Sequence, residues 1–114
     1  MNFDEPSLRS RVSRLRNEVD DLDLRLLEIL AKRAAVVREL AGYKCALGIP
    51  LRDPKRESEM AELHARWADR LGLPQPLVSE LFSVVLRSSR ELQASLRHGA
   101  AHRKETSSAR KIRA

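Results

Sequence analysis

The chain has 114 residues, of which 42% are hydrophobic and 33% are charged, and its formal net charge is +6. This length suits one domain with a modest core, and the composition is typical of amphipathic helices with solvated outer faces. No run of about 18 apolar residues is present that could span a bilayer. Cys45 is the single cysteine and the polar N-terminus has no apolar signal segment, which together favour a cytoplasmic location.

The positive charge is concentrated at the C-terminus. Residues 97–114 contain six Lys and Arg and one acidic residue, Glu105, so this segment carries five of the six net positive charges. It is rich in Ser, Ala and charged residues, and we expect it to be disordered. Clustered charge alone is weak support for binding, so a solvated tail is expected over a nucleic-acid interface.

Residues 7–45 are expected to form one long helix, because they contain no proline and no glycine before Gly42. Either Ser7 or Asp4, with Pro6 in the first turn, could cap its start. Apolar residues recur at alternating steps of three and four, as in a helical seam: Leu8, Val12, Leu15, Val19, Leu22, Leu26, Ile29, Val36 and Leu40. At about 1.5 Å per residue the helix is too long to bury this stripe in its own domain, so a second chain is expected to cover it.

Two cations interrupt the apolar seam. Arg33 lies between Ile29 and Leu40, and Lys44 follows on the same face three turns later. A buried unpaired cation is costly, so each requires an anionic partner from the protein or from a ligand. Arg16 points about 100° away from Arg33, so any site that it serves is expected to belong to the partner chain.

Two further helices are expected after the stop at Ile49-Pro50. Asp53-Pro54 is a strong helix start, with Asp as the N-cap, and the buried stripe of this helix is expected to consist of Met60, Leu63, Trp67 and Leu71. The third helix is expected over residues 75–97. Its expected inward face consists of Val78, Leu81, Phe82, Val85, Leu92 and Leu96, continued by Ser89 and Gln93.

Other site chemistries find no support in the sequence. The histidines have no partners at metal-ligand spacing, the glycines form no phosphate loop, and no nucleophile–base arrangement is evident. We therefore expect neither a metal nor a cofactor. Fixed cations and hydrogen-bonding side chains suit a small polyanion and electrostatic stabilisation instead.

The charged and apolar positions combine into one extended motif: Leu15-Arg16, Val19-Asp20-x-x-Asp23, Leu26-Leu27-x-x-Leu30-x-x-Arg33, Tyr43-Lys44, Ile49-Pro50-Leu51-Arg52-Asp53-x-x-Arg56-Glu57 and Leu81-Phe82-x-x-Val85-x-x-x-Ser89-x-x-x-Gln93. Over residues 8–96 this motif resembles the all-helical, AroQ-type chorismate mutases. The resemblance implies an all-α fold with one long, one short and one medium helix per protomer in an intertwined homodimer. It implies a domain at 7–96, between an N-terminal extension (1–6) and the tail (97–114).

The resemblance also implies the activity, which is the Claisen rearrangement of the dianion chorismate to prephenate in the shikimate pathway to aromatic amino acids. Carried over residue by residue, Arg33 and Arg16 of the neighbouring chain would bind the two substrate carboxylates. Ser89 would assist at one of these carboxylates.

The remaining implied roles concern the ether oxygen and the ring hydroxyl. Lys44 and Gln93 would hold the ether oxygen, while Arg56 and Glu57 would position the ring hydroxyl, with the Asp53 backbone nearby. For Asp53 itself, helix capping is expected over catalysis.

Four alternatives stay open. An isochorismate pyruvate lyase or an aminodeoxychorismate mutase could use the same scaffold, although the Arg52-Asp53-x-x-Arg56-Glu57 loop favours a mutase acting on a hydroxylated ring. A non-enzymatic helical dimer could bind a partner through its basic tail. The dimer could also dock to another shikimate-pathway enzyme.

Overall fold

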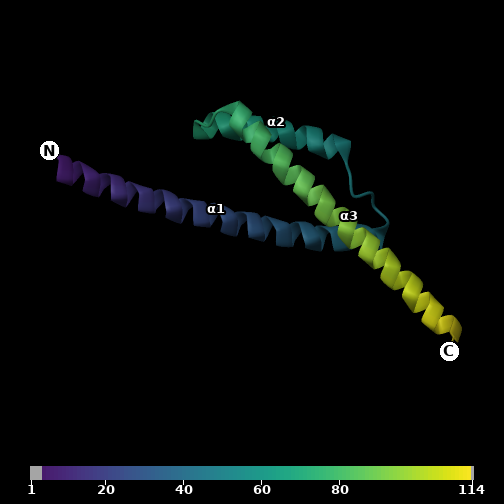
Figure 1. The fold of residues 1–114 in the computed structure, drawn as a ribbon. Helices are drawn as coiled ribbons and strands as arrows, with labels where there is room; N and C mark the ends of the chain where they lie inside the picture. The colour runs from purple at the N-terminus through teal and green to yellow at the C-terminus, as the bar shows by residue number, and fades with distance from the viewer. Residues whose placement is uncertain (1–3, 114) are drawn as a thin grey trace. The chain divides into compact units, whose positions relative to one another are not determined.

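The structure of the chain, a computed structural model, describes the backbone of residues 4–113 and the side chains of residues 4–99. This part of the chain forms three helices, α1 (Glu5–Leu47), α2 (Pro54–Leu71) and α3 (Gln75–Arg113), and contains no strand (Figure 1). The predicted all-α fold with three helices is confirmed. Within the described residues, none of these helices offers an apolar stretch sufficient to cross a membrane.

The helix ends follow local sequence signals. The backbone N–H of Leu8 donates to the carbonyl of Asp4 at 3.0 Å, so α1 starts ahead of Ser7 and has Pro6 in its first turn. Its other end is closed by Gly48, which adopts the left-handed conformation at φ 68°. The N–H of Ile49 then donates to the carbonyl of Lys44 at 2.9 Å.

The start of α2 matches the prediction, and its end is set by a glycine. The Asp53 carboxylate accepts a hydrogen bond from the backbone N–H of Arg56 at 3.1 Å, and Pro54 occupies the first helical position. Gly72, at φ 69°, ends the helix in the left-handed conformation that a residue with a Cβ rarely adopts. The short turn after it leads directly into α3.

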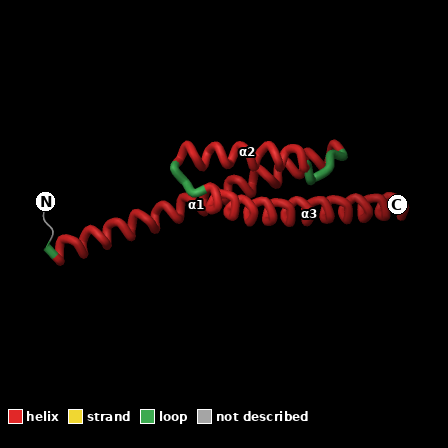
Figure 2. The backbone as a smooth tube through the Cα atoms, turned by 90° about the horizontal axis from the view of Figure 1, so that it is seen from above, coloured by secondary structure: helices red, strands yellow, loops and turns green. Residues whose placement is uncertain are grey.

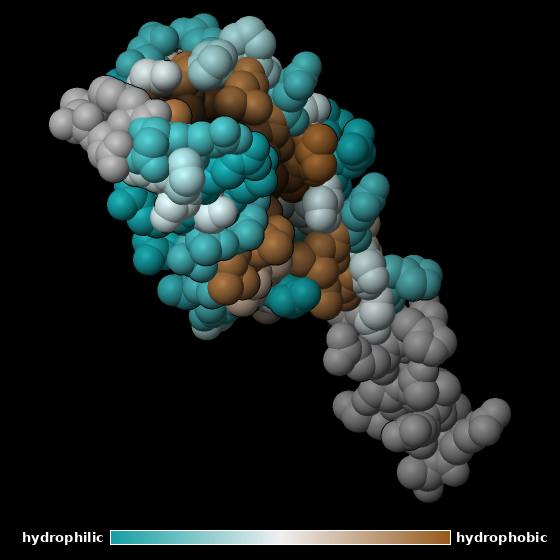
Figure 3. All heavy atoms as spheres, turned by 60° about the vertical axis from the view of Figure 1, so that its left-hand side comes forward, coloured by the Kyte–Doolittle hydropathy of each residue, from teal (hydrophilic) through white to brown (hydrophobic). Residues whose placement is uncertain are grey.

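The chain divides within α1 into two compact units, one up to Ala35 and the other from Val36 onward. In the first unit the apolar stripe is open to solvent, with Leu22 55% and Ile29 61% exposed. Hydrophobic side chains are visible at the surface on the face drawn in Figure 3. This is the exposure expected of a helix whose apolar stripe requires a cover from outside its own unit.

The second unit is built on the packing of α2 against α3 (Figure 2). The ring of His64, 8% exposed, stacks on Phe82 with the ring centroids 3.6 Å apart, and Ala68 and Val78 are buried beside the stack. The predicted α2 stripe is therefore partly wrong. Met60 and Leu63 are half-buried, but Trp67 and Leu71 are exposed, because the contact centres on His64 and on the small side chain of Ala68, which allows close approach.

The inward face of α3 is largely as predicted. Val78 is buried, the side chains of Phe82, Val85, Leu92 and Leu96 are half-buried, and Leu81 is the exception at 47% exposed. The helix does not end near Arg97 but continues to Arg113, so it has 39 residues and is close in length to the 43 residues of α1. The side chains of residues 100–114 lie outside the described residues, and the disorder expected for the tail stays a prediction.

We expect Leu22→Lys to weaken self-association of the chain, because a lysine in the apolar stripe removes about 1.5–3 kcal/mol of burial per copy. Light scattering coupled to size exclusion over a range of concentrations measures the effect. Glu28→Lys introduces the same residue away from the stripe and should leave the association unchanged. A wild-type chain that stays monomeric at every concentration would contradict the expectation.

Candidate functional site

The eight side chains expected in the site divide between the two units. Arg16, which is exposed, and Arg33, which is half-buried, lie on α1 within the first unit. The other six lie in the second unit: Lys44, Asp53, Arg56, Glu57, Ser89 and Gln93. The place of Arg16 and Arg33 beside these six therefore stays a prediction.

Lys44 is a half-buried cation in the last turn of α1. Its Nζ donates to the backbone carbonyl of Leu51 at 3.3 Å, across the loop that joins α1 to α2. Among the described residues it makes no ion pair with a carboxylate. An ammonium group has three N–H donors, so after the bond to Leu51 it can still donate to an anionic or ether oxygen.

Arg97 of α3 also binds this loop, a role that the sequence reasoning missed. Its Nη2 donates to the carbonyl of Ile49 at 2.5 Å, and its Nε lies 3.5 Å from the Sγ of Cys45, the neighbour of Lys44. Gln93 precedes Arg97 by one helical turn and so shares its face. These contacts bring the α3 face that carries Gln93 to the end of α1 that carries Lys44.

The two polar side chains on the inner face of α3 differ in how they are used. The Oγ of Ser89 donates to the carbonyl of Val85 one turn earlier at 2.9 Å, a common helix back-bond. The Oε1 of Gln93 is buried and accepts no hydrogen bond from the described residues. Leaving a buried polar atom unpaired is costly, and rotation of the amide would offer Nε2 as a donor at the same place. Gln93 therefore has hydrogen-bonding capacity available for a ligand.

The first turn of α2 supplies the remaining candidates. Asp53 caps the helix through its carboxylate, as predicted, and the side chain of Arg56 is exposed. The Oε1 of Glu57 lies 3.2 Å from Nη2 of Arg90 and 3.6 Å from Nε of Arg52. Arg90 belongs to α3 and was also missed by the sequence reasoning, although it directly follows Ser89.

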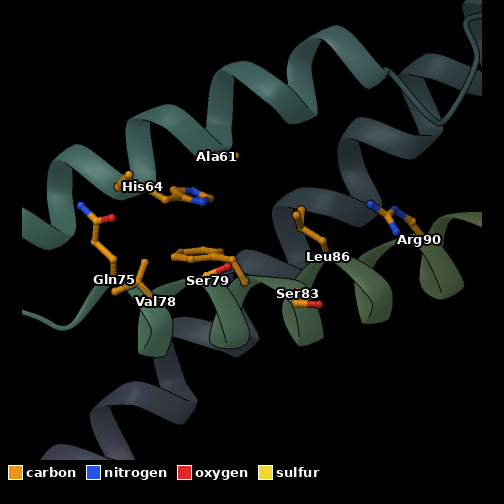
Figure 4. Close-up of a pocket in the computed structure, with 10 residues that line it drawn as sticks. Ala61, His64, Gln75, Val78, Ser79, Ser83, Leu86 and Arg90 are labelled. Carbon is orange, nitrogen blue, oxygen red and sulfur yellow. The ribbon is translucent and has the colours of Figure 1, made fainter.

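A cavity of about 410 Å³ lies between α2 and α3 (Figure 4). Gln75 is at one end, Arg90 is at the other, and His64 covers an aromatic ring of α3 between them. None of the eight predicted residues lines this cavity. Arg90, which does line it, also pairs with Glu57.

The chemistry available at this end of the second unit is that of cations and hydrogen-bonding groups. No group of three or more His, Cys, Asp or Glu within the described residues is arranged to hold a metal ion. Cationic donors fixed by neighbouring backbone suit an anionic organic ligand and the stabilisation of developing negative charge.

Comparison with known proteins adds an independent finding. The family model described as chorismate mutase type II matches residues 15–94, a span that contains all eight candidate residues. The chain is 34% identical over 80 residues to the T-protein of Enterobacter agglomerans, but it spans only 21% of that protein's length.

Three relatives that are matched over most of their length have names stating different activities. A chorismate mutase of Methanocaldococcus jannaschii is 23% identical over 83 residues, which are 73% of this chain and 84% of the relative. A 4-amino-4-deoxychorismate mutase of Streptomyces venezuelae is 32% identical over a match that covers 68% of this chain and 76% of the relative's length. An isochorismate pyruvate lyase of Pseudomonas aeruginosa is 32% identical over a match that covers 63% of this chain and 70% of the relative's length.

We expect Arg97→Ala to lower the melting temperature by several degrees, because it removes the charge-assisted bond to the Ile49 carbonyl, worth about 1 kcal/mol for a partly exposed group. Thermal unfolding followed by circular dichroism measures the shift. His98→Ala changes the exposed neighbour of Arg97 and should melt like the wild type. An unchanged melting temperature for Arg97→Ala would show that the contact with the loop does not stabilise the fold.

Proposed function

We propose that this chain, which belongs to the chorismate mutase type II family, is itself a chorismate mutase that converts chorismate to prephenate. Membership of an enzyme family supports an isomerase, and the relatives with other named activities make the particular reaction a proposal. The proposal rests on how well the chemistry of the candidate site fits what this reaction requires.

The rearrangement of chorismate is unimolecular. A carbon–oxygen bond breaks while a carbon–carbon bond forms, so neither a nucleophile nor a cofactor is required. The enzyme must hold a flexible dianion in its compact, reactive conformation and must stabilise the negative charge that grows on the ether oxygen. Both tasks fall to fixed cations and hydrogen-bond donors rather than to proton transfer.

The site residues divide between these tasks. Lys44 and Gln93 would donate to the ether oxygen as its bond to carbon lengthens. Arg56 and Glu57 would position the ring hydroxyl, and Asp53 would keep the backbone of this turn in place as the N-cap of α2. Two observations carry the proposal: Lys44 is half-buried with donors left after its bond to a carbonyl, and the buried Oε1 of Gln93 has no partner among the described residues, so its amide can rotate to donate through Nε2.

The substrate carboxylates would be bound by residues of α1. Arg33 would bind one carboxylate with help from Ser89, and Arg16 of the partner subunit would bind the other in an intertwined homodimer. The exposed apolar stripe of α1 supports a second copy as the cover of this helix. Each dimer would then contain two equivalent sites.

We expect Lys44→Ala to lower kcat by about 10²–10³, because removing one donor to a developing oxyanion costs about 3–4 kcal/mol of barrier. The measurement is the loss of chorismate absorbance at saturating substrate, with circular dichroism to verify that the helices remain. Lys32→Ala, which removes an exposed lysine from α1, is the matched control and should keep wild-type turnover. A fully active Lys44→Ala enzyme would contradict the role.

The nearest alternatives are the other two reactions named among the relatives. The isochorismate pyruvate lyase reaction would consume isochorismate, and the aminodeoxychorismate mutase reaction would consume the 4-amino substrate. The Arg56-Glu57 pair favours a hydroxylated ring. Turnover of each substrate by the same preparation separates the three activities.

A different class of alternative is a non-enzymatic dimer that binds a partner through the tail. We expect a chain truncated after Gly99 to keep full mutase activity, since the candidate residues all lie at or before Gln93 and Arg97 is retained. The tail-binding alternative instead predicts that the truncated chain loses its partner and that the intact chain shows no turnover.

Docking to another shikimate-pathway enzyme and a cytoplasmic location stay predictions.

A further inference from the structure

We propose that Arg90 determines substrate specificity: together with Arg52 it compensates the charge of Glu57, so the subsite accepts a neutral ring hydroxyl in preference to a ring ammonium. This inference rests on the proposed function, in which Glu57 faces the ring substituent. It addresses the difference between the hydroxylated and the amino-substituted substrate, which the family match alone leaves open.

The geometry concentrates two positive charges on one carboxylate oxygen. Nη2 and Nε of Arg90 lie 3.2 and 3.3 Å from Oε1 of Glu57, and Nε of Arg52 lies 3.6 Å from the same atom. Within the described residues, no contact falls on Oε2, which can therefore accept a hydrogen bond from a ligand. The Glu57 side chain is only 26% exposed, whereas those of Arg90 and Arg52 are 45% and 67% exposed.

The charges around Glu57 determine whether its Oε2 binds a ring ammonium or a ring hydroxyl more strongly. An amine on a saturated ring carbon is an ammonium near neutral pH, whereas a hydroxyl is neutral. A lone carboxylate would attract the ammonium strongly, but two guanidinium groups beside it cancel that attraction and repel the cation. The hydroxyl only requires an acceptor, and Oε2 of Glu57 supplies one while Arg90 pairs with Oε1.

A purely structural ion pair is the competing explanation, because Arg90 also joins α3 to the first turn of α2. Loss of such a pair would lower stability and the amount of active enzyme, but it would change the turnover of both substrates by the same factor. The ratio of kcat/KM for the two substrates is therefore the informative quantity. Both substrates carry the same two carboxylates, so the contribution of these groups to kcat/KM also cancels in this ratio.

The experiment measures kcat/KM for chorismate and for 4-amino-4-deoxychorismate with the full-length wild type and four variants. In Arg90→Met the preference for chorismate should fall about three- to tenfold, the range expected for a partly exposed charge near the ligand. Arg90→Lys retains a positive charge and should retain most of the preference. Arg87→Met, which removes an exposed arginine one turn away, should retain all of it.

Arg52→Met provides a second test should Arg90→Met fold poorly, and it should shift the ratio in the same direction by a smaller factor. An unchanged ratio in Arg90→Met and Arg52→Met, with the wild type active on chorismate, would overturn the specificity role and leave the proposed function intact. A wild type that prefers the amino substrate would also overturn it. A wild type that converts neither substrate would overturn the proposed function and this inference with it.

Discussion

Burial of the apolar stripe on α1 is the constraint on which the rest of the structure depends. Its nine members are between 41% and 63% exposed in the single chain. At about 1.5–3 kcal/mol for each side chain fully buried, such a stripe represents more than about 10 kcal/mol of unrealised burial, which is comparable to the stability of a whole small domain. Any chain that buries the stripe also removes water from Arg33, so an anion beside that guanidinium would interact with it more strongly.

In the second unit, the loop between α1 and α2 connects the end of α1 to α3. Two cations from different helices, Lys44 of α1 and Arg97 of α3, donate to carbonyls of this loop. The ion pair between Arg90 and Glu57 joins α3 to the first turn of α2. Bonds from charged donors to backbone carbonyls are directional and stronger than neutral ones. The loop therefore sets where the polar face of α3 lies relative to Lys44.

The parts of the structure that the sequence predicts are those with local causes. Asp53-Pro54 starts α2 where it was expected, and α1 ends next to the predicted stop at Ile49-Pro50. The left-handed glycines at 48 and 72 likewise end their helices through residues within one turn. The α2 stripe was partly wrong, because the stack of His64 on Phe82 is a tertiary contact that helical periodicity does not encode. Arg90 and Arg97 were missed for the same reason, since their partners lie 33 and 48 residues away.

The candidate site shows why residue type alone does not assign a role. Ser89 and Gln93 continue the same apolar face, and either could be an ordinary satisfied polar group in a helical core. Their bonding in the structure differs: the hydroxyl of Ser89 donates to the Val85 carbonyl, a bond that it would exchange for a substrate carboxylate in the proposed function, while Oε1 of Gln93 is buried without a partner among the described residues. A buried polar atom without a partner costs free energy, and in the proposed function the substrate would complete the hydrogen bonding of this amide. Lys44 lies at the end of α1 that Arg97 contacts, and its ammonium can still donate after its bond to the Leu51 carbonyl. In the proposed site, a ligand between Lys44 and Gln93 would therefore carry an oxygen acceptor and a negative charge.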